Sequence, residues 1–271
     1  MSAVRAAVAA GHPATVAAGI EILEDGGTAA DAAVAACLAS CVAETVMTGL
    51  LGGGHAIYWD RSRGWNLDCF VTVPSGTGSD VVDLAVPFGE EVVHYAVGPG
   101  TCGVPGLPAG LGALSQRFGK LPWRRLVEPA TRLARAGVRM PPAHASCLAM
   151  LEPVFTLREE GRAIYAPHGH LLESGDVLSQ PGLAAALELL AEEGSRSAYD
   201  GSIAEALLSG IDGVASPGPT SRRTSTSGTT RSRCHTRAHA SSRAAVSQAS
   251  PRRSCVCRAF VGSARRPECR P

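Results

Sequence analysis

A glycine-rich crossing between an expected helix and an expected strand is the part of this sequence best suited to approach a ligand. Residues 42–60 carry an acid, Glu44, then the glycine-rich run 49–54, then the aromatic and β-branched residues 55–60, which are typical of a buried strand. Glycines there allow positive φ and close approach of the backbone to a strand or a ligand. Because close backbone approach is the commoner use of such glycines, we favour a structural crossing over direct ligand contact.

One pair of cysteines and one pair of histidines are spaced closely enough for each pair to bind a metal. Cys37 and Cys41 lie one helical turn apart, so a metal or redox pair is one reading; buried small hydrophobes are the other. Nothing charged lies near them in sequence to lower a thiol pKa, which favours the second reading. His168 and His170 lie in an Ala-Pro-His-Gly context with no third ligand in view, so we expect a surface turn and no metal site.

Nucleotide-binding and hydrolase motifs are incomplete in this sequence. Residues 98–103 imitate G-x-G-x-x-G after a strand, but Pro99 and Pro105 interrupt the region where the helix of a dinucleotide fold should begin. Gly119-Lys120 lacks the upstream glycine of a phosphate loop. There is no G-x-S-x-G elbow and no ordered serine, histidine and acid triad. We therefore expect no cofactor and no independent catalytic residue.

An ordered succession of short motifs runs through most of the chain. The first part contains Gly11-His12-Pro13, Ala17-Ala18-Gly19, Leu23, Gly26-Gly27, Ala30-Asp31-Ala32-Ala33-Val34-Ala35, Glu44 and the glycines of 49–54. The second part contains Gly103-Val104-Pro105-Gly106, Ala109-Gly110-Leu111, Phe118-Gly119-Lys120-Leu121-Pro122-Trp123, Pro129-Ala130 and Leu133-Ala134. Over about residues 4–215 this succession resembles the γ-glutamyltranspeptidase (γ-glutamyltransferase) family.

The resemblance implies a fold and a chemistry. Family members resemble N-terminal nucleophile hydrolases: a precursor cuts itself before a Thr, whose hydroxyl becomes the nucleophile and whose freed amine acts as the base. The implied fold class is α/β, here the large-subunit half of an incomplete αββα sandwich with a disordered tail. The implied activity is hydrolysis or transfer of an amide or γ-glutamyl bond, as in glutathione metabolism, on a small-molecule substrate, with a small subunit as partner.

One position departs from the family pattern. In the family an Arg two residues after Leu-Asp grips the α-carboxylate of the γ-glutamyl substrate, and here Leu67-Asp68 is followed by Cys69 and Phe70. A phenyl ring cannot supply the paired donors that fix a carboxylate. We therefore expect a relative that acts on a different amide, and no other substrate-binding residue is assigned.

Punctuation by Pro and Gly divides the body into elements. We expect helices at about 13–25, 28–43, 107–118, 123–136, 143–157 with a break near Pro153, 180–193 and 197–208, and strands at 55–60, 65–73 and 92–97. The strands at 55–60 and 65–73 should form a hairpin through the turn 61–64, and the helices 107–118 and 123–136 should pack as a pair. Without a second section of the fold, Ile57, Trp59 and Leu67 should face no partner, so the chain alone should aggregate.

The sequence changes character at about Pro217. The tail 217–271 has twelve Arg, no Lys, no Leu, no Ile and one acid, Glu268, so it carries +11 against −10 for residues 1–216. We read two regions, a family-like body at 1–216 and a disordered tail at 217–271. Three explanations of the tail stay open: a basic arm that binds nucleic acid, a zinc site of Cys234, His235, Cys255 and Cys257, or translation out of frame. The mixture of Arg, Ser, Ala, Pro and Cys favours the frameshift and hence a truncated body.

The nucleophile of the family is not found. Thr229-Thr230 is followed by Arg231, and we expect no strand behind it, so the chain alone should be inactive. The alternative function is a non-enzymatic acidic body with a basic nucleic-acid arm. With no secretory or membrane-spanning pattern and an odd nine cysteines, the sequence predicts a cytoplasmic protein without membrane attachment.

Overall fold

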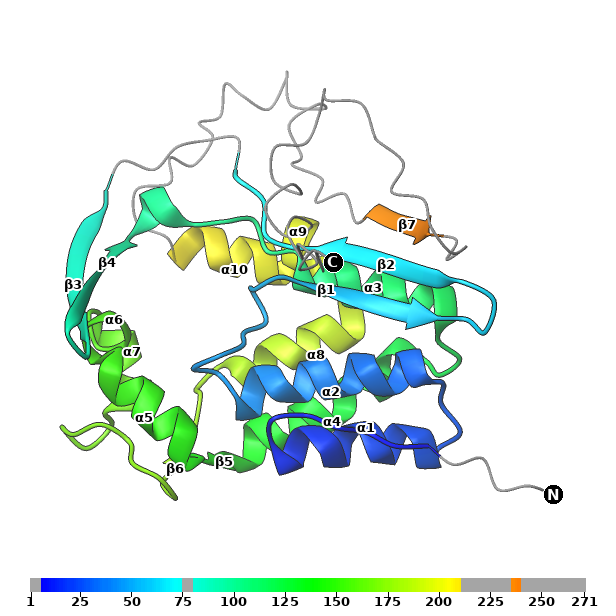
Figure 1. Cartoon of the computed structure of the whole chain (residues 1–271), viewed down its shortest axis with the longest axis horizontal. Coiled ribbons are helices and arrows are strands. Elements are labelled where there is room, and N and C mark those ends of the chain that lie inside the picture. Colours follow the sequence, from blue (N-terminus) through cyan, green and yellow to red (C-terminus); the bar gives the residue numbers. More distant parts are fainter. Residues whose placement is uncertain (1–5, 75–79, 211–234, 240–271) are drawn as a thin grey trace, which may run out of the picture. The chain divides into compact units, whose positions relative to one another are not determined.

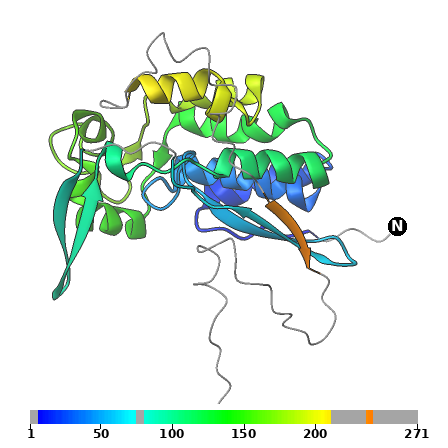
Figure 2. The same cartoon turned by 90° about the horizontal axis from the view of Figure 1, so that it is seen from above.

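The computed structural model describes residues 6–74, 80–210 and 235–239. The chain divides into two units, Met1–His239 and Ala240–Pro271, and every element below belongs to the first (Figures 1 and 2). In chain order the described elements are α1 (Pro13–Glu24), α2 (Ala29–Ala43), β1 (Gly54–Trp59), β2 (Gly64–Cys69), β3 (Val82–Phe88), β4 (Glu91–Val97), the 3-10 turn η1 (Pro99–Thr101), α3 (Leu107–Phe118), α4 (Trp123–Ala136), β5 (Val138–Arg139), α5 (Pro142–Met150), α6 (Glu152–Phe155), α7 (Glu159–Tyr165), β6 (Val177–Leu178), α8 (Leu183–Glu193), α9 (Ser197–Asp200), α10 (Ser202–Gly210) and β7 (His235–His239).

The first two helices begin where the capping residues predict. Pro13 opens α1, and the Ala14 N–H donates to Nδ1 of His12 over 3.0 Å. At α2 the Thr28 hydroxyl accepts from the Asp31 N–H (3.2 Å) while Oδ2 of Asp31 accepts from the Thr28 N–H (2.8 Å), which completes a capping box. The sequence prediction of both helix starts is confirmed.

Helix α2 lies at the centre of the main core. It packs against α1, α3 and α4, and α4 packs in turn against α8. The side chains buried most completely in this core come from α1, α2, α4 and α8: Ile22, Val34, Leu38, Leu126, Val127, Leu187 and Leu190. Close packing is possible because α2 is rich in alanine, which lets neighbouring helix axes approach.

Helices α3 and α4 have the predicted bounds but not the predicted packing. Each contacts α2, and the expected pairing of one with the other is wrong. The reason is the loop between them: Oδ2 of Asp31 accepts from the Lys120 N–H (2.8 Å), and the Lys120 ammonium donates to the Gly26 carbonyl (3.0 Å). These bonds fix the loop against the start of α2, so both helices lie along that helix.

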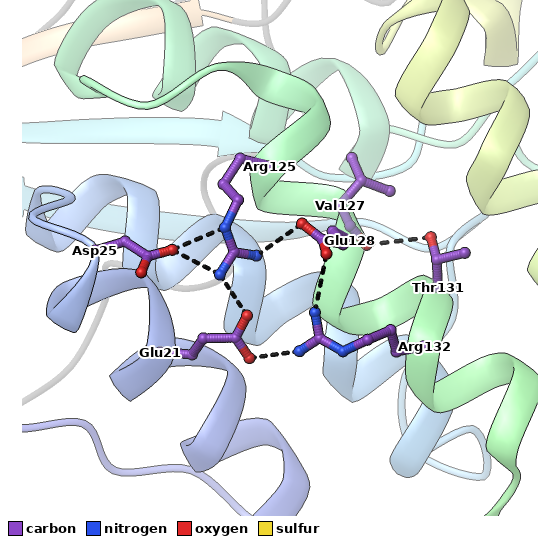
Figure 3. Close-up of polar contacts among 7 residues, drawn as sticks. All are labelled: Glu21, Asp25, Arg125, Val127, Glu128, Thr131 and Arg132. Carbon is purple, nitrogen blue, oxygen red and sulfur yellow. Dashed lines mark hydrogen bonds and ion pairs between the residues drawn. The ribbon is translucent and has the colours of Figure 1, made fainter.

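An ion-pair network joins α1 to α4 at the surface (Figure 3). The Arg125 guanidinium reaches Asp25 (Nη2–Oδ2 2.6 Å), Glu21 and Glu128 (Nη1–Oε2 3.1 Å). Arg132 adds a second guanidinium, 2.5 Å from Glu21 and 3.3 Å from Glu128. Two guanidiniums and three carboxylates therefore hold helices about a hundred residues apart in sequence.

Strands β1 and β2 form the predicted antiparallel hairpin, with β1 Gly54 opposite β2 Cys69. Its turn is fixed by Asp60, whose Oδ1 accepts from the Ser62 and Arg63 N–H groups (3.0 and 2.9 Å) and whose Oδ2 accepts from the Trp65 indole (2.6 Å). A carboxylate that accepts from several donors in one turn defines the strand register.

The two faces of the hairpin have opposite environments. Tyr58 faces the helices and stacks on Phe118 with ring centroids 4.1 Å apart. On the other face Ile57 is 84% exposed and Trp59 is 55% exposed, as the sequence predicts for a sheet without its partner. Two expectations are wrong: the strand is buried on one face only, and Leu67 is buried, because alternation along β2 turns it toward the helices.

A short strand of the tail lies at the other edge of this hairpin. β7 pairs antiparallel with β2, and Asp68 is opposite His235. The expectation that no strand follows Thr229-Thr230 is therefore wrong, because an open strand edge can accept backbone pairing from a segment that lacks an apolar pattern. Residues 217–234 and 240–271 lie outside the described residues, so the boundary at 216 and the disorder of the rest of the tail stay predictions.

The remaining elements form smaller assemblies. β3 and β4 form an antiparallel ribbon of which only β4 was predicted, and β5 pairs with β6. A second apolar cluster, Met140, Leu148, Tyr165, Leu172 and Leu178, lies under α5 and α7. α5 and α6 are separated at Leu151, close to the predicted break. In the part of the chain described here, every helix is too short or too polar to cross a bilayer.

Candidate functional site

The segment at the end of β2, Cys69 to Val71, is enclosed by glycines. A Cβ on Gly53 would lie 2.6 Å from the Val71 nitrogen, and a Cβ on Gly106 would lie 2.1 Å from the Cys69 carbonyl oxygen. A Cβ on Gly110 would lie 2.5 Å from Sγ of Cys69. Real carbon atoms do not approach so closely, so any side chain at these positions would displace the segment.

Backbone hydrogen bonds hold the same segment from both sides. The Gly52 carbonyl accepts from the N–H groups of Gly106 and Leu107, each over 3.0 Å, which ties the glycine crossing to the start of α3. Thr72 forms an isolated antiparallel bridge with Val104, with N–O distances of 3.0 and 2.8 Å. β2 therefore ends at Cys69, earlier than predicted, and the chain continues as a strap pinned to the start of α3.

In the crossing Gly53 serves close approach of the backbone, and none of Gly52, Gly53 and Gly54 has an unusual torsion. Positive φ occurs at other glycines of the described residues, and Gly52, Gly53 and Gly54 are not among them. The structural reading of the crossing is confirmed at Gly53, where backbone meets backbone. The crossing acts as the wall that fixes the position of Phe70.

Phe70 lies at the solvent-facing end of this strap. Its ring is half exposed and stacks on His55 of β1, with ring centroids 5.9 Å apart and planes 10° apart. Its N–H donates to Oδ1 of Asp68 (3.1 Å), and the same oxygen lies 3.6 Å from Nδ1 of His55. The three side chains form a small cluster with an aromatic surface and one carboxylate.

This cluster can bind but holds no activated nucleophile. Phe70 has no N–H donor in its side chain, so it cannot clamp a carboxylate as a guanidinium does. The nearest thiol, Cys69, is buried and donates to the Gly54 carbonyl (3.1 Å), and burial raises its pKa, so it stays protonated. Burial likewise raises the pKa of Cys41 to about 12. The arrangement therefore offers an aromatic surface and a carboxylate, and its thiol is protonated.

The other candidate residues of the sequence do not join this cluster. Cys41 is buried as expected, whereas Cys37 is exposed, which corrects the prediction that both are buried. His168 and His170 lie in an exposed turn, as predicted. Residues 6–74, 80–210 and 235–239 contain no group of three or more His, Cys, Asp or Glu able to hold a metal. Thr229, Thr230, Cys234, Cys255 and Cys257 lie outside the described residues.

Sequence reasoning missed His55 and Asp68 as members of the site. The signal was present in the hairpin: a register fixed by the turn 60–63 places His55 directly opposite Asp68. It also missed the environment of Glu44, which is buried and accepts from the Thr15 hydroxyl over 2.7 Å. No local pattern shows that contact, because Thr15 and Glu44 belong to different helices.

Comparison with known proteins finds the same family in sequence profiles, curated relatives and solved structures. A family profile described as gamma-glutamyltranspeptidase matches residues 15–217. Glutathione hydrolase 3 of Arabidopsis thaliana is 31% identical over 196 residues, which are 71% of this chain and 30% of that protein. Acylase ACY 1 proenzyme of Pseudomonas sp. (strain V22) is 35% identical over 210 residues, 75% of this chain and 38% of the relative.

The likeness extends to a solved structure. The γ-glutamyltranspeptidase of Pseudomonas nitroreducens, in complex with L-DON, superposes with a TM-score of 0.65 at 28% identity, over 77% of this chain and 61% of that chain. The mixed helix and strand fold class predicted from the sequence is confirmed, and it covers part of the neighbour's fold. The chain spans about a third of the length of the curated relatives named above.

Proposed function

Because this chain belongs to the γ-glutamyltranspeptidase family, we propose that it is the large-subunit half of an amide hydrolase or transferase whose nucleophile lies in a second section. Two observations support the proposal. The family match ends at residue 217, and the chain spans about a third of its relatives. At the site the Cys69 thiol is buried and protonated, and the described residues there offer no activated group that could replace a nucleophilic Thr. On this proposal the chain alone binds but does not turn over substrate.

The substrate is an amide whose acyl group is not anchored by its α-carboxylate. The observation that carries this is Phe70, which stands where the family pattern has an Arg and presents a ring stacked on His55. Asp68 adds a negative charge within 3.6 Å of that ring pair, which further disfavours a carboxylate there. A neutral acyl chain is therefore the substrate class that fits this position.

The second section, a small subunit in the family pattern, would cover the exposed face of the β1–β2 hairpin. Ile57 and Trp59 expose large apolar surface on that face, and such surface on a sheet is typical of an interface. On this proposal the tail 217–271 is an out-of-frame product that replaces the start of the second section. A cytoplasmic location is part of the proposal and is supported by free thiols at all cysteines of the described residues.

Intact-mass analysis tests whether the nucleophile lies in a second section and not in the 271-residue chain. The 271-residue chain, incubated at neutral pH, should keep its mass and leave amide substrates unchanged. A longer product, with the reading frame changed after Ser216, should split before a Thr into two associated subunits and become active. A discrete cleavage product or turnover by the 271-residue chain, abolished by one Thr→Ala change, would contradict the proposal.

A further inference from the structure

A cavity beside α2 that none of the hairpin residues lines has no role in the function proposed above. Its volume is about 700 Å³, and it lies between residues 6–10 and the helices α1 and α2. Most of its wall is alanine, with Ala33 and Ala36 of α2 facing residues 6–10. Small-molecule sites are typically of this size, with apolar walls and a few polar groups.

One polar group of the wall is not satisfied by the protein. The Glu44 carboxylate lines the cavity although Glu44 is only 9% exposed. Its Oε1 accepts from the Thr15 hydroxyl (2.7 Å), and Oε2 has no hydrogen-bond partner among the described residues. Oε2 is not one of the fully enclosed side-chain atoms that lack a partner in the described residues, so a donor or counter-charge in the cavity can reach it.

The position of Glu44 in the helix adds to the demand for positive charge. Glu44 is the C-cap of α2, a helix of 15 residues, so the negative end of the helix dipole lies beside its carboxylate. The last turn of α2 contains no basic residue. Glu44 is also the one ionisable carboxylate among the residues that line the cavity, where Thr15, Ser40 and Cys37 supply the other polar side chains. Carboxylate and helix end therefore attract a cation to the same point.

We propose that this cavity binds a small aliphatic ammonium ligand, with its charged head on Glu44 and its hydrocarbon body along the alanine wall. The ammonium supplies the missing donor to Oε2 and the missing counter-charge at the end of α2. The apolar body replaces water on the wall formed by Ala33 and Ala36. An uncharged ligand should bind more weakly, and so should the ammonium ligand when a larger side chain fills the cavity.

The exposed thiol of Cys37 gives a local readout, because it lines the cavity. The probe is n-hexylammonium, with 1-hexanol as its neutral counterpart, and the full chain is alkylated with iodoacetamide and mapped by peptide mass spectrometry. We expect n-hexylammonium at millimolar concentration to slow alkylation of Cys37 several-fold. Alkylation of Cys102, an exposed thiol that does not line the cavity, should not change. Equal protection by 1-hexanol, or no protection at Cys37, would overturn the proposal.

Two variants test separately whether binding needs the charge of Glu44 and the open volume beside Ala36. Glu44→Gln keeps the shape of the side chain and should weaken n-hexylammonium binding by about tenfold or more. Glu24→Gln removes the same charge from an exposed position of α1 outside the cavity, and it should bind like the parent. Ala36→Leu fills the wall, retains Glu44 and should also abolish protection, so the test does not depend on one variant that must fold. Unchanged protection in Glu44→Gln or in Ala36→Leu, with a parent-like circular dichroism spectrum, would refute the proposed site.

Discussion

Replacing Arg125 should weaken the attachment of α1 to α4 by more than a typical surface mutation does. The Arg125 side chain is 25% exposed and contacts Asp25, Glu21 and Glu128 (Figure 3). Arg125→Met keeps most of the aliphatic stem and removes the guanidinium. It leaves three carboxylates around one remaining guanidinium, Arg132, so repulsion adds to the lost hydrogen bonds.

The magnitude follows from the number and exposure of these contacts. An exposed ion pair contributes roughly 0.2–1 kcal/mol, and a network of several partners contributes more than one pair. Loss of three partly exposed partners should lower the free energy of unfolding by about 1–2 kcal/mol. The matched control is Arg124→Met, because Arg124 is 74% exposed and has one contact of 3.5 Å, to Glu192. The control should change stability by less than about 0.5 kcal/mol.

Urea unfolding, followed by tryptophan fluorescence and circular dichroism, measures both variants. In 1 M salt the difference between Arg125→Met and the parent should shrink, because exposed charges are screened. Burial raises the pKa of Glu21, but hydrogen bonds from Arg125 and Arg132 outweigh it and hold that pKa below its ordinary value of 4.5. This stabilisation is present above pH 4.5 and is lost as pH falls through the lowered pKa of Glu21. The difference in unfolding free energy between Arg125→Met and the parent should therefore shrink in acid. Equal stability of the Arg125 and Arg124 variants, or a gap independent of salt, would refute the reasoning.

Three further predictions concern the crossing, the exposed face and the tail. Gly53→Ala should lower the free energy of unfolding by about 2 kcal/mol or more, because its Cβ would meet the Val71 backbone. Gly54→Ala has open space around the added carbon and should lower it by less than about 1 kcal/mol. Urea unfolding measures both variants. Ile57→Glu should reduce self-association in analytical ultracentrifugation, because Ile57 is 84% exposed, and an unchanged sedimentation profile would exclude this face as the cause. Limited trypsin digestion should cut the tail at arginines outside β7, from about Arg222 onward, without loss of the helical circular dichroism signal, and protection of those arginines would contradict the disorder predicted there.

Local chemistry made much of the fold predictable. α3 and α4 have the predicted bounds because Pro and Gly residues punctuate both ends, and the capping box at Thr28 and Asp31 marks the start of α2. α8 begins at Leu183, three residues later than predicted, since Pro181-Gly182 precedes it. The break at Gly201 divides the last predicted helix into α9 and α10.

What the sequence did not predict depends on contacts between distant segments. The expected pairing of α3 with α4 failed because Asp31, about ninety residues upstream, binds the loop between them. The Phe70 position could be found from its motif, but its stack on His55 depends on the hairpin register and on the glycine wall. β7 lies in a segment whose composition carries no strand pattern, so only the open edge of β2 accounts for it.

The specificity of a frame-restored protein tests the central claim most directly. The measurement is kcat/KM for a γ-glutamyl anilide and for butyryl anilide, a neutral acyl counterpart, in the restored protein and in its Phe70→Arg and Phe70→Leu variants. We expect preference for the neutral anilide with Phe70 intact and a gain of about tenfold or more on the γ-glutamyl anilide in Phe70→Arg. Phe70→Leu, which removes the ring without adding charge, should show no such gain. Efficient γ-glutamyl turnover with Phe70 intact would show that Phe70 does not exclude the α-carboxylate.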